Sequence, residues 1–237
     1  MLQTALYTDI GGRSCNEDCV RQCSSGGDSL CLILADGLGG HGGGDRASDT
    51  VCRTLCEGFA GRVSPAILID LLNEAHKNIK ALQTPQCSMK STAVALTIGN
   101  GRVAWAHVGD SRLYHFLDGK LIFQTRDHSA SQIAVMLGDI TADQIRFHED
   151  RNRVLRALGQ DGALKVDAAE EFLSPGSHAY LLCSDGFWEY VLEHEMEEDL
   201  HLASDPEDWL RRMRERLAAR IPPDNDNNTA AAVWLTR

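Results

Sequence analysis

The chain alternates between short apolar runs and amphipathic segments, whose periods predict both strands and helices. Residues 30–35 are almost wholly apolar, which is typical of a strand buried on both faces. Residues 45–60 carry apolar side chains at helical spacing and predict an amphipathic helix. Its apolar stripe consists of Ala47, Val51, Leu55 and Phe59. A second helix starts with Ser64 as cap and Pro65 in the first turn, and it runs to about Leu82.

A β-rich stretch follows, in which tight turns join short strands. The predicted strands are residues 2–8, 30–35, 92–98, 102–108, 112–117, 120–125, 163–168, 179–183 and 230–235. Asn100-Gly101 and Asp118-Gly119 are dipeptides that favour two-residue hairpins. Residues 128–160 are polar and helical in pattern, and a further helix is predicted over 206–220.

This order of elements predicts the fold class. Neighbouring helices followed by neighbouring hairpins do not make a doubly wound parallel sheet. We expect an α+β fold, with two antiparallel β-sheets packed as a sandwich and flanked by α-helices on both outer faces. Because the sequence has no internal repeat and no linker, residues 1–237 are expected to form a single domain.

Charge and cysteine usage restrict the class of partner. The chain has 23 Lys and Arg against 34 Asp and Glu, a net charge of −11, which argues against nucleic acid and anionic membranes as partners. The eight cysteines form no CxxC pair, so zinc is not expected and reduced thiols are the simpler interpretation. Without a signal peptide or an apolar run of about 18 residues, we expect a soluble, cytoplasmic protein. We also expect it to be a monomer.

Four acidic clusters stand beside glycine or asparagine at the ends of predicted strands. They are Asn16-Glu17-Asp18, Asp36-Gly37, Asp185-Gly186 and Asp226-Asn227. If the fold brings these strand ends together, the carboxylates face each other and cannot all stay ionised without cations between them. Hard divalent cations with oxygen ligands answer that need. The clusters therefore predict a metal-dependent hydrolase.

Each acidic residue also has a purely structural interpretation. Asp36 is placed to cap the helix that follows it, and Asp110 to form the turn before a strand. Asp226 is placed for an Asx turn before the last strand. Asp185 is placed to cap a helix, with Glu189 reaching back in a capping box.

Two motifs point to other functions and fail on their context. The stretch Gly37 to Gly42 matches G-x-G-x-x-G, but a second helix follows it where a dinucleotide site needs a parallel strand. The stretch from Asp224 resembles the start of a calcium loop, but Thr229 and Leu235 stand where glycine and glutamate are required.

Six motifs, taken in order, resemble the PPM family of metal-dependent, protein phosphatase 2C-like serine/threonine phosphatases. They are Gly12-Arg13-Ser14-Cys15-Asn16-Glu17-Asp18, Asp36-Gly37-Leu38-Gly39-Gly40-His41, Gly109-Asp110-Ser111-Arg112, Thr125-Arg126-Asp127-His128-Ser129, Cys183-Ser184-Asp185-Gly186-Phe187-Trp188-Glu189 and Asp226-Asn227-Asn228-Thr229. Their order and spacing cover nearly the whole chain. The resemblance implies hydrolysis of phosphoserine and phosphothreonine in proteins by a metal-bound hydroxide, in a single catalytic domain.

The resemblance and the chemistry together predict a centre of two or three Mg²⁺ or Mn²⁺ ions. Its expected ligands are Glu17, Asp18, Asp36, the Gly37 carbonyl, Asp110, Asp185, Glu189 and Asp226. Asp36 is the natural bridging ligand, because a carboxylate has two oxygens, and Asp110 matches a position that helps to hold a third ion. Glu189 stands where many relatives carry Asp, which leaves its role as a ligand open.

Two further residues are assigned to catalysis. Arg13 is suited to clamp the substrate phosphate, although an ion pair with Glu17 is the alternative. His41 is a candidate to protonate the leaving oxygen, with support of its glycine-rich loop as the alternative.

The expected partners are phosphorylated proteins, a serine/threonine kinase among them, and the resemblance extends to stand-alone bacterial enzymes, including those of type VI secretion clusters. Residues 127–159 correspond to the family's flap beside the site, where Arg151, Arg153 and Arg156 are placed to meet a phosphopeptide. Two rivals remain. A phosphodiesterase would normally use His ligands, and none of the nine His stands in a ligand cluster in the sequence. A non-catalytic phosphoprotein-binding module would be expected to lack the acidic residues.

Overall fold

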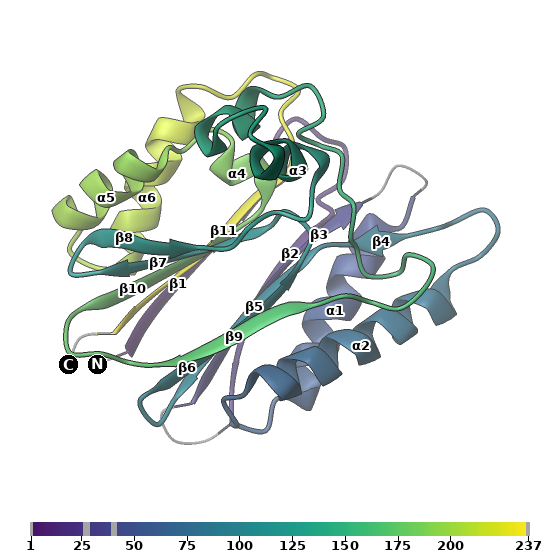
Figure 1. Cartoon of the computed structure of the whole chain (residues 1–237), viewed down its shortest axis with the longest axis horizontal. Coiled ribbons are helices and arrows are strands. Elements are labelled where there is room, and N and C mark those ends of the chain that lie inside the picture. Colours follow the sequence, from purple (N-terminus) through teal and green to yellow (C-terminus); the bar gives the residue numbers. More distant parts are fainter. Residues whose placement is uncertain (1, 26–28, 39–41, 236–237) are drawn as a thin grey trace.

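Two β-sheets lie face to face, and helices cover both outer surfaces (Figure 1). The computed structural model describes residues 2–25, 29–38 and 42–235. All of its strand pairs are antiparallel. The expected α+β sandwich with helices on both outer faces is therefore confirmed.

The first sheet has the strand order β1-β11-β10-β7-β8. Its strands are β1 (Leu2–Asp9), β7 (Arg112–Leu117), β8 (Lys120–Gln124), β10 (His178–Cys183) and β11 (Asn228–Leu235). Three helices lie on its side of the sandwich: α4 (Asp185–Trp188), α5 (Glu193–Leu202) and α6 (Pro206–Ala218). The first and last strands of the chain are thus neighbours in one sheet.

The second sheet has the order β2-β3-β5-β6-β9, and β4 pairs with β3. Its strands are β2 (Asp18–Ser24), β3 (Leu30–Leu38), β4 (Lys90–Ser91), β5 (Ala93–Gly99), β6 (Arg102–Val108) and β9 (Asp167–Phe172). Helices α1 (Gly44–Gly58) and α2 (Pro65–Leu82) cover its outer face. Between β8 and β9, helix α3 (Ala130–Leu137) and the 3-10 helix η1 (Ala142–Phe147) stand above the edge of the sandwich (Figure 1).

Three apolar clusters hold these layers together. One lies between the sheets and includes Leu32, Leu96 and Val233. A second lies under α1 and α2, and a third lies under α5 and α6. A fully buried large aliphatic side chain contributes about 1.5–3 kcal/mol, so these layers supply most of the driving force for folding.

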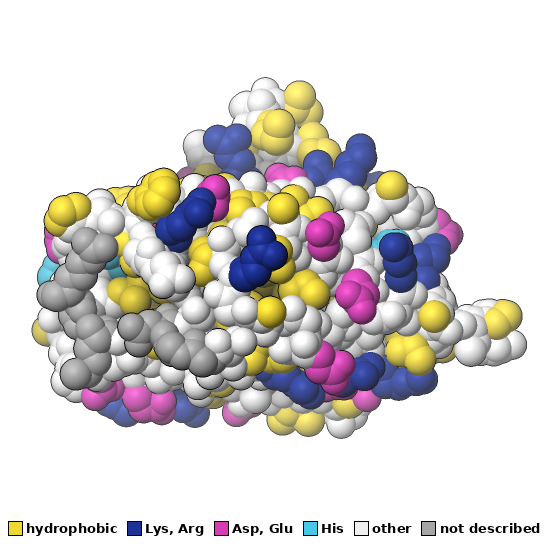
Figure 2. Space-filling view, turned by 90° about the horizontal axis from the view of Figure 1, so that it is seen from below, with side chains coloured by type: hydrophobic (Ala, Val, Ile, Leu, Met, Phe, Trp, Pro, Cys, Tyr) yellow, Lys and Arg dark blue, Asp and Glu magenta, His cyan; other side chains and the backbone are white. Residues whose placement is uncertain are grey.

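The outer surface carries charges of both signs. In the view of Figure 2, Lys and Arg side chains alternate with Asp and Glu rather than gathering into one basic area. In the part of the chain that the structure describes, no helix has the length and apolar content needed to cross a bilayer.

The element boundaries differ from the sequence predictions in three places. Strand β9 begins at Asp167 rather than 163, because Leu164 and Val166 pack against the core under α2 without joining a ladder. Strand β2 was not predicted, since it is a half-exposed edge strand with polar side chains. Helix α5 was given no bounds, because its acidic side chains show no clear apolar periodicity.

Candidate active site

Five acidic residues converge at one end of the sandwich because five strand ends meet there. Asp18 begins β2 and lies opposite Asp36, near the end of β3. In the other sheet, Cys183 at the end of β10 pairs with both Arg112 and Ala230. The residues just outside those strand ends are Asp110, Asp185 and Asp226.

The carboxylates influence one another, which confirms that they are neighbours. Burial raises the pKa of Asp36 well above its usual range, and the next causes are Asp18, Asp185, Asp110 and Asp226. The pKa of Asp185 is raised in the same way, first by burial and then by Asp110 and Glu189. Such shifts mean that the protein disfavours this set of negative charges unless a cation balances them.

Asp110 has the carboxylate whose hydrogen-bonding capacity is least satisfied. Its side chain is 2% exposed, and neither carboxylate oxygen has a hydrogen-bond partner among the described residues. Burial raises its pKa to about 7. Within the described ranges, Asp18, Asp36, Asp110 and Asp185 also form no salt bridge. Oxygen donors that lack both hydrogen bonds and basic neighbours fit a hard divalent cation.

The capping interpretations of Asp36, Asp185 and Glu189 are not supported. The N-cap of α1 is Gly43 rather than Asp36, and Ser184 precedes α4 without a side-chain cap bond. Glu189 receives a hydrogen bond from Arg151 Nε at 3.1 Å instead of closing a capping box. Only Asp226 makes a local turn contact, accepting from the Asn227 N–H at 2.8 Å.

A cavity of about 450 Å³ opens beside Asp36, Asp185 and Asp226. Its lining residues are Arg13, Ser14, Cys15, Glu17, Asp36, Gly37, Leu38, Asn152, Val154, Asp185, Asp226 and Asn227. Arg13 Nη2 lies 2.8 Å from Asp226 Oδ2, and about half of each side chain is exposed. Arg13 therefore pairs with Asp226 and not with Glu17. Asn152 and Val154 bring the flap segment 127–159 to the cavity, whereas His41 lies outside the described residues.

Glycine is required where the loops meet beside the cavity. A Cβ on Gly37 would lie 2.2 Å from the Gly44 carbonyl oxygen, and a Cβ on Gly44 would lie 2.7 Å from the Glu17 carboxyl carbon. The Gly37 N–H also donates to the Glu17 carbonyl at 3.0 Å. No other residue type permits this approach of three backbone segments.

Sequence reasoning missed the polar residues that hold the ligands in place. Ser184 Oγ donates to Asp18 Oδ2 at 2.8 Å. Asn227 Oδ1 accepts from the Glu17 N–H at 2.8 Å, while its Nδ2 donates to the Ile10 and Cys15 carbonyls. Each of these residues is the direct sequence neighbour of a predicted ligand. That position is the one signal by which the sequence could have identified them.

Comparison with known proteins decides the family. The protein phosphatase 2C family model matches residues 8–227. The chain belongs to the protein phosphatase 2C family. It is 35% identical over 183 residues to the serine/threonine phosphatase stp of Listeria monocytogenes, with 71% of each chain covered. It is therefore a bacterial-type protein serine/threonine phosphatase.

Two solved structures extend the likeness to the whole fold of this phosphatase. The catalytic domain of the phosphatase PstP, in complex with two manganese ions, has 28% identity and a TM-score of 0.81, covering 99% of both chains. PppA, a regulatory component of the type VI secretion system in Pseudomonas aeruginosa, has 27% identity and a TM-score of 0.77, covering 98% of this chain and 96% of its own.

One histidine group in the phosphatase corrects the expectation that no histidines gather. Among the described residues, only His107, His128 and Asp167 offer three ligand atoms within 4.8 Å of one another, which makes them a candidate metal site by distance. However, the Gly109 N–H donates to His128 Nδ1 at 3.1 Å, so the other nitrogen of this neutral ring carries the proton. That nitrogen faces Asp167 and Arg156. The hydrogen bonds therefore favour a structural role beside the Asp110 loop.

Among the described residues, no three of the cavity carboxylates offer oxygens that all lie within 4.8 Å of one another. That spacing is expected for a centre of several ions, because ligands then surround cations that themselves lie about 3.5–4 Å apart.

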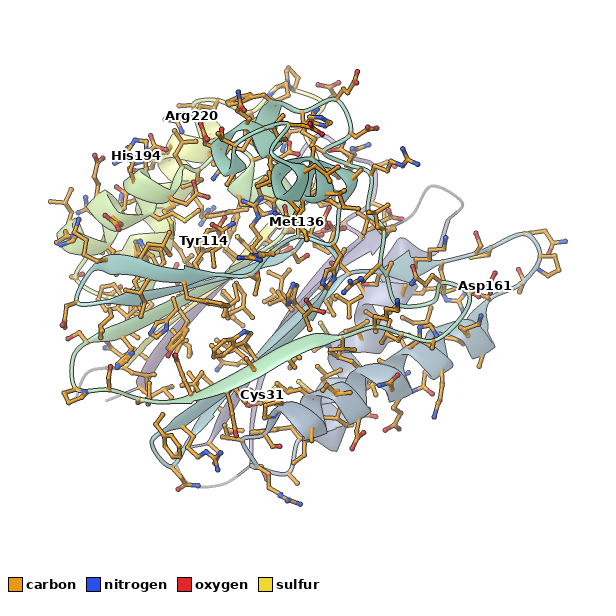
Figure 3. All side chains as sticks on the ribbon, viewed as in Figure 1. Cys31, Tyr114, Met136, Asp161, His194 and Arg220 are labelled. Carbon is orange, nitrogen blue, oxygen red and sulfur yellow. The ribbon has the colours of Figure 1, made fainter. Side chains whose placement is uncertain are left out.

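A buried ion pair between Arg112 and Asp127 lies next to the loop that carries Asp110. Arg112 donates to both oxygens of Asp127, at 2.8 and 2.7 Å, and its guanidinium lies 3.4 Å from the Trp188 ring centre. Trp188 Nε1 in turn donates to the Asp110 carbonyl at 3.0 Å. Tyr114, labelled in Figure 3 on the first sheet, accepts from Arg112 at 3.1 Å.

Replacing Asp127 with Ala is expected to destabilise the phosphatase by about 3–5 kcal/mol, because Arg112 would then be buried without its partner. The free energy of unfolding in urea measures this. Asp161→Ala is the matched control: Asp161 also pairs with a base, Lys80 at 2.7 Å, but its side chain is fully exposed, so no measurable loss of stability is expected. Equal losses in the two variants would contradict the assignment.

Proposed function

We propose that the acidic cavity is the catalytic centre of a phosphatase that acts on phosphoserine and phosphothreonine in proteins and uses two or three Mn²⁺ or Mg²⁺ ions. The observation that carries the proposal is the gathering of Asp18, Asp36, Asp110 and Asp185 without a basic partner among the described residues. The relative solved with two manganese ions supports the same chemistry.

The ligand assignments follow from the positions of the side chains. Asp36 is central, since all four other aspartates raise its pKa, and we assign it as the bridging ligand. Asp18, Asp185, Asp226 and the Gly37 carbonyl complete the proposed inner set, and Asp110 is assigned to a further ion. Glu17 lines the cavity, and burial raises its pKa. When bound, the cations lower the pKa of water and neutralise the charge on the phosphoryl oxygens.

Glu189 is assigned a secondary role. Its side chain accepts from Arg151, while burial raises its pKa. Glu189 also raises the pKa of Asp185, so its carboxylate belongs to the same group of acidic side chains. We propose that Glu189 orients Arg151 beside the cavity and approaches an ion only through water.

The chain's own residues supply binding and orientation. The loop that carries Arg13 is held rigidly, because the Gly12 N–H donates to the Asn225 carbonyl at 3.0 Å and a Cβ on Gly12 would lie 2.2 Å from the Pro223 carbonyl oxygen. Arg13 thus stands at the rim of the cavity with several N–H groups available to a phosphate. We propose that it exchanges its contact with Asp226 for the substrate phosphate.

The reaction class is tested with two substrates in parallel. With Mn²⁺ present, we expect rapid release of phosphate from a phosphothreonine peptide and slow cleavage of a phosphate diester. Faster cleavage of the diester would replace the proposal with a phosphodiesterase.

Arg13→Ala is expected to raise KM for a phosphopeptide by about 10- to 100-fold, since a hydrogen bond to a charged group contributes about 1.5–3 kcal/mol. Arg13→Lys is the matched control. Its KM should lie between those of the wild type and Arg13→Ala, because lysine keeps the charge without the bidentate geometry. Steady-state kinetics measure both variants. A KM unchanged in Arg13→Ala would remove this residue from substrate binding.

We further propose that the enzyme is a single catalytic domain that reverses the action of a bacterial serine/threonine kinase. The likeness to PppA supports a place in a type VI secretion system. A pull-down of phosphoproteins by the inactive Asp36→Asn enzyme tests this, and we expect it to recover kinase substrates from such a system. Recovery of kinase substrates from outside a type VI secretion system would contradict the proposed place in it.

A further inference from the structure

Five cysteines gather where the edge strand β2 meets α1. They are Cys19 and Cys23 on β2, Cys31 on β3, and Cys52 and Cys56 on α1. All five belong to the core under α1, and Figure 3 labels Cys31 on the sheet that α1 covers. Cys19 and Cys23 are four residues apart and lie on one face of the strand. Cys52 and Cys56 are also four residues apart and lie on one face of the helix. The cysteines therefore form two successive contacts between β2 and α1.

The contact between Cys19 and Cys52 includes a hydrogen bond from a thiol to the backbone. Cys52 Sγ donates to the carbonyl oxygen of Cys19 at 3.4 Å. Cys19 is half-buried, Cys52 is buried, and both are free thiols. Cys52 Sγ therefore already lies against the residue with which it would form a covalent bond.

The position of β2 permits that movement. It pairs with β3 alone in the second sheet, so a shift toward α1 strains one ladder and not two. On the other side, α1 packs through its fully buried face and provides a fixed support. Cys52 also lies near the middle of α1, away from the fraying end of the helix.

We propose that Cys19 and Cys52 form a dithiol site that peroxide oxidises to a disulfide, which covalently links β2 to α1. One cysteine sulfur attacks a peroxide oxygen, which breaks the O–O bond, gives a sulfenic acid and releases one water. The second sulfur then displaces the hydroxyl group as another water while the S–S bond forms. The two thiols lose two electrons and two protons, and hydrogen peroxide is reduced to two waters. A small thiol reductant reverses the bond by exchange.

The disulfide is expected to reach the active site, a consequence that rests on the proposed function. Asp18 directly precedes Cys19, and α1 begins at Gly44, where a Cβ would lie 2.7 Å from Glu17. No space remains there for the helix and the strand to shift independently. Drawing β2 toward α1 therefore displaces Asp18 and the adjoining Glu17, and a misplacement of about 1 Å reduces activity by on the order of tenfold or more.

Tryptic peptides of the full-length protein separate the possible bonds. Cys52 is the one cysteine in peptide 47–53, and Cys19 lies in peptide 14–21 with Cys15. Cys23 and Cys31 share peptide 22–46, and Cys56 is alone in peptide 54–62. After treatment with hydrogen peroxide, we expect peptide 14–21 joined to peptide 47–53, with fragmentation placing the bond at Cys19. The link should disappear with dithiothreitol.

Matched variants then connect the bond to its effects. Oxidised wild-type protein should unfold about 5–10 °C higher than reduced protein and lose phosphatase activity reversibly. Cys19→Ser should lose the link, the thermal shift and the sensitivity to peroxide. Cys23→Ser, on the same face of the same strand, should keep all three. Cys52→Ala tests the bond from the helix side if Cys19→Ser folds poorly.

The mass and thermal measurements do not depend on phosphatase activity. If the link forms in an enzyme that never hydrolyses phosphopeptides, the proposed function fails and the oxidation site stands. An unlinked peptide 47–53 after peroxide treatment would overturn the oxidation site, as would a link between peptides 22–46 and 54–62 in its place.

Discussion

Asp36→Asn is expected to reduce kcat for a phosphothreonine peptide by about a thousandfold or more. Asparagine keeps the size of the side chain and one oxygen. However, it removes the negative charge and the second oxygen, and a carboxylate that binds two cations needs both. The loss of a single electrostatic contact at a reaction centre already costs about 10²–10³ in kcat. Steady-state kinetics at saturating Mn²⁺ measure the effect.

The same variant should be more stable than the wild type when both are metal-free. Burial and four carboxylates raise the pKa of Asp36 in the folded protein. A group with a raised folded pKa destabilises the fold above its unfolded pKa when it is an acid, so the wild type carries this penalty at neutral pH. Removing the charge should raise the midpoint of thermal unfolding in EDTA.

Asp70→Asn is the control for both measurements, because Asp70 is an exposed residue on α2. Neither kcat nor the unfolding midpoint should change. Full activity in Asp36→Asn would refute the catalytic assignment of the cavity.

Removal of divalent cations is expected to abolish activity, and readdition of Mn²⁺ should restore it. Without cations the orphaned carboxylate of Asp110 and its neighbours repel one another, and no group in the cavity activates water. Mn²⁺ at about 100 times its Kd should stabilise the fold by about 2.7 kcal/mol, or about 5–10 °C in the unfolding midpoint. Activity and thermal scans across a Mn²⁺ titration measure both effects.

The stabilisation by Mn²⁺ should be much smaller in Asp36→Asn, and it should be retained in Asp70→Asn. Phosphatase activity that persists in excess EDTA would contradict the proposed use of metal ions, whatever the thermal scans give.

Much of the fold was predictable because its signals are local. The apolar run 30–35 became the buried strand β3, and Asn100-Gly101 became the turn between β5 and β6. At that turn Asn100 adopts a positive φ of 52°, which asparagine tolerates better than most residues. Helix α2 begins at Pro65, as its cap and proline indicated.

Elements whose stability comes from distant contacts were not predictable. Strand β2 has a weak pattern of its own and forms because β3 and α1 flank it. Residues 163–166 have strand-like apolar side chains, yet they pack against a core without a ladder partner. The histidine group also depends on the fold, since its members come from β6, the flap and β9.

The sequence by itself determined the family and the candidate residues, because the order and type of the acidic motifs are properties of the chain. Tertiary structure decided which of them act on one another. The antiparallel pairing of β1 with β11 and of β2 with β3 brings Asp226, Asp18 and Asp36 together from distant parts of the sequence. The resulting burial and mutual repulsion are the physical reason to propose cations at this site, and neither exists until the strand ends meet.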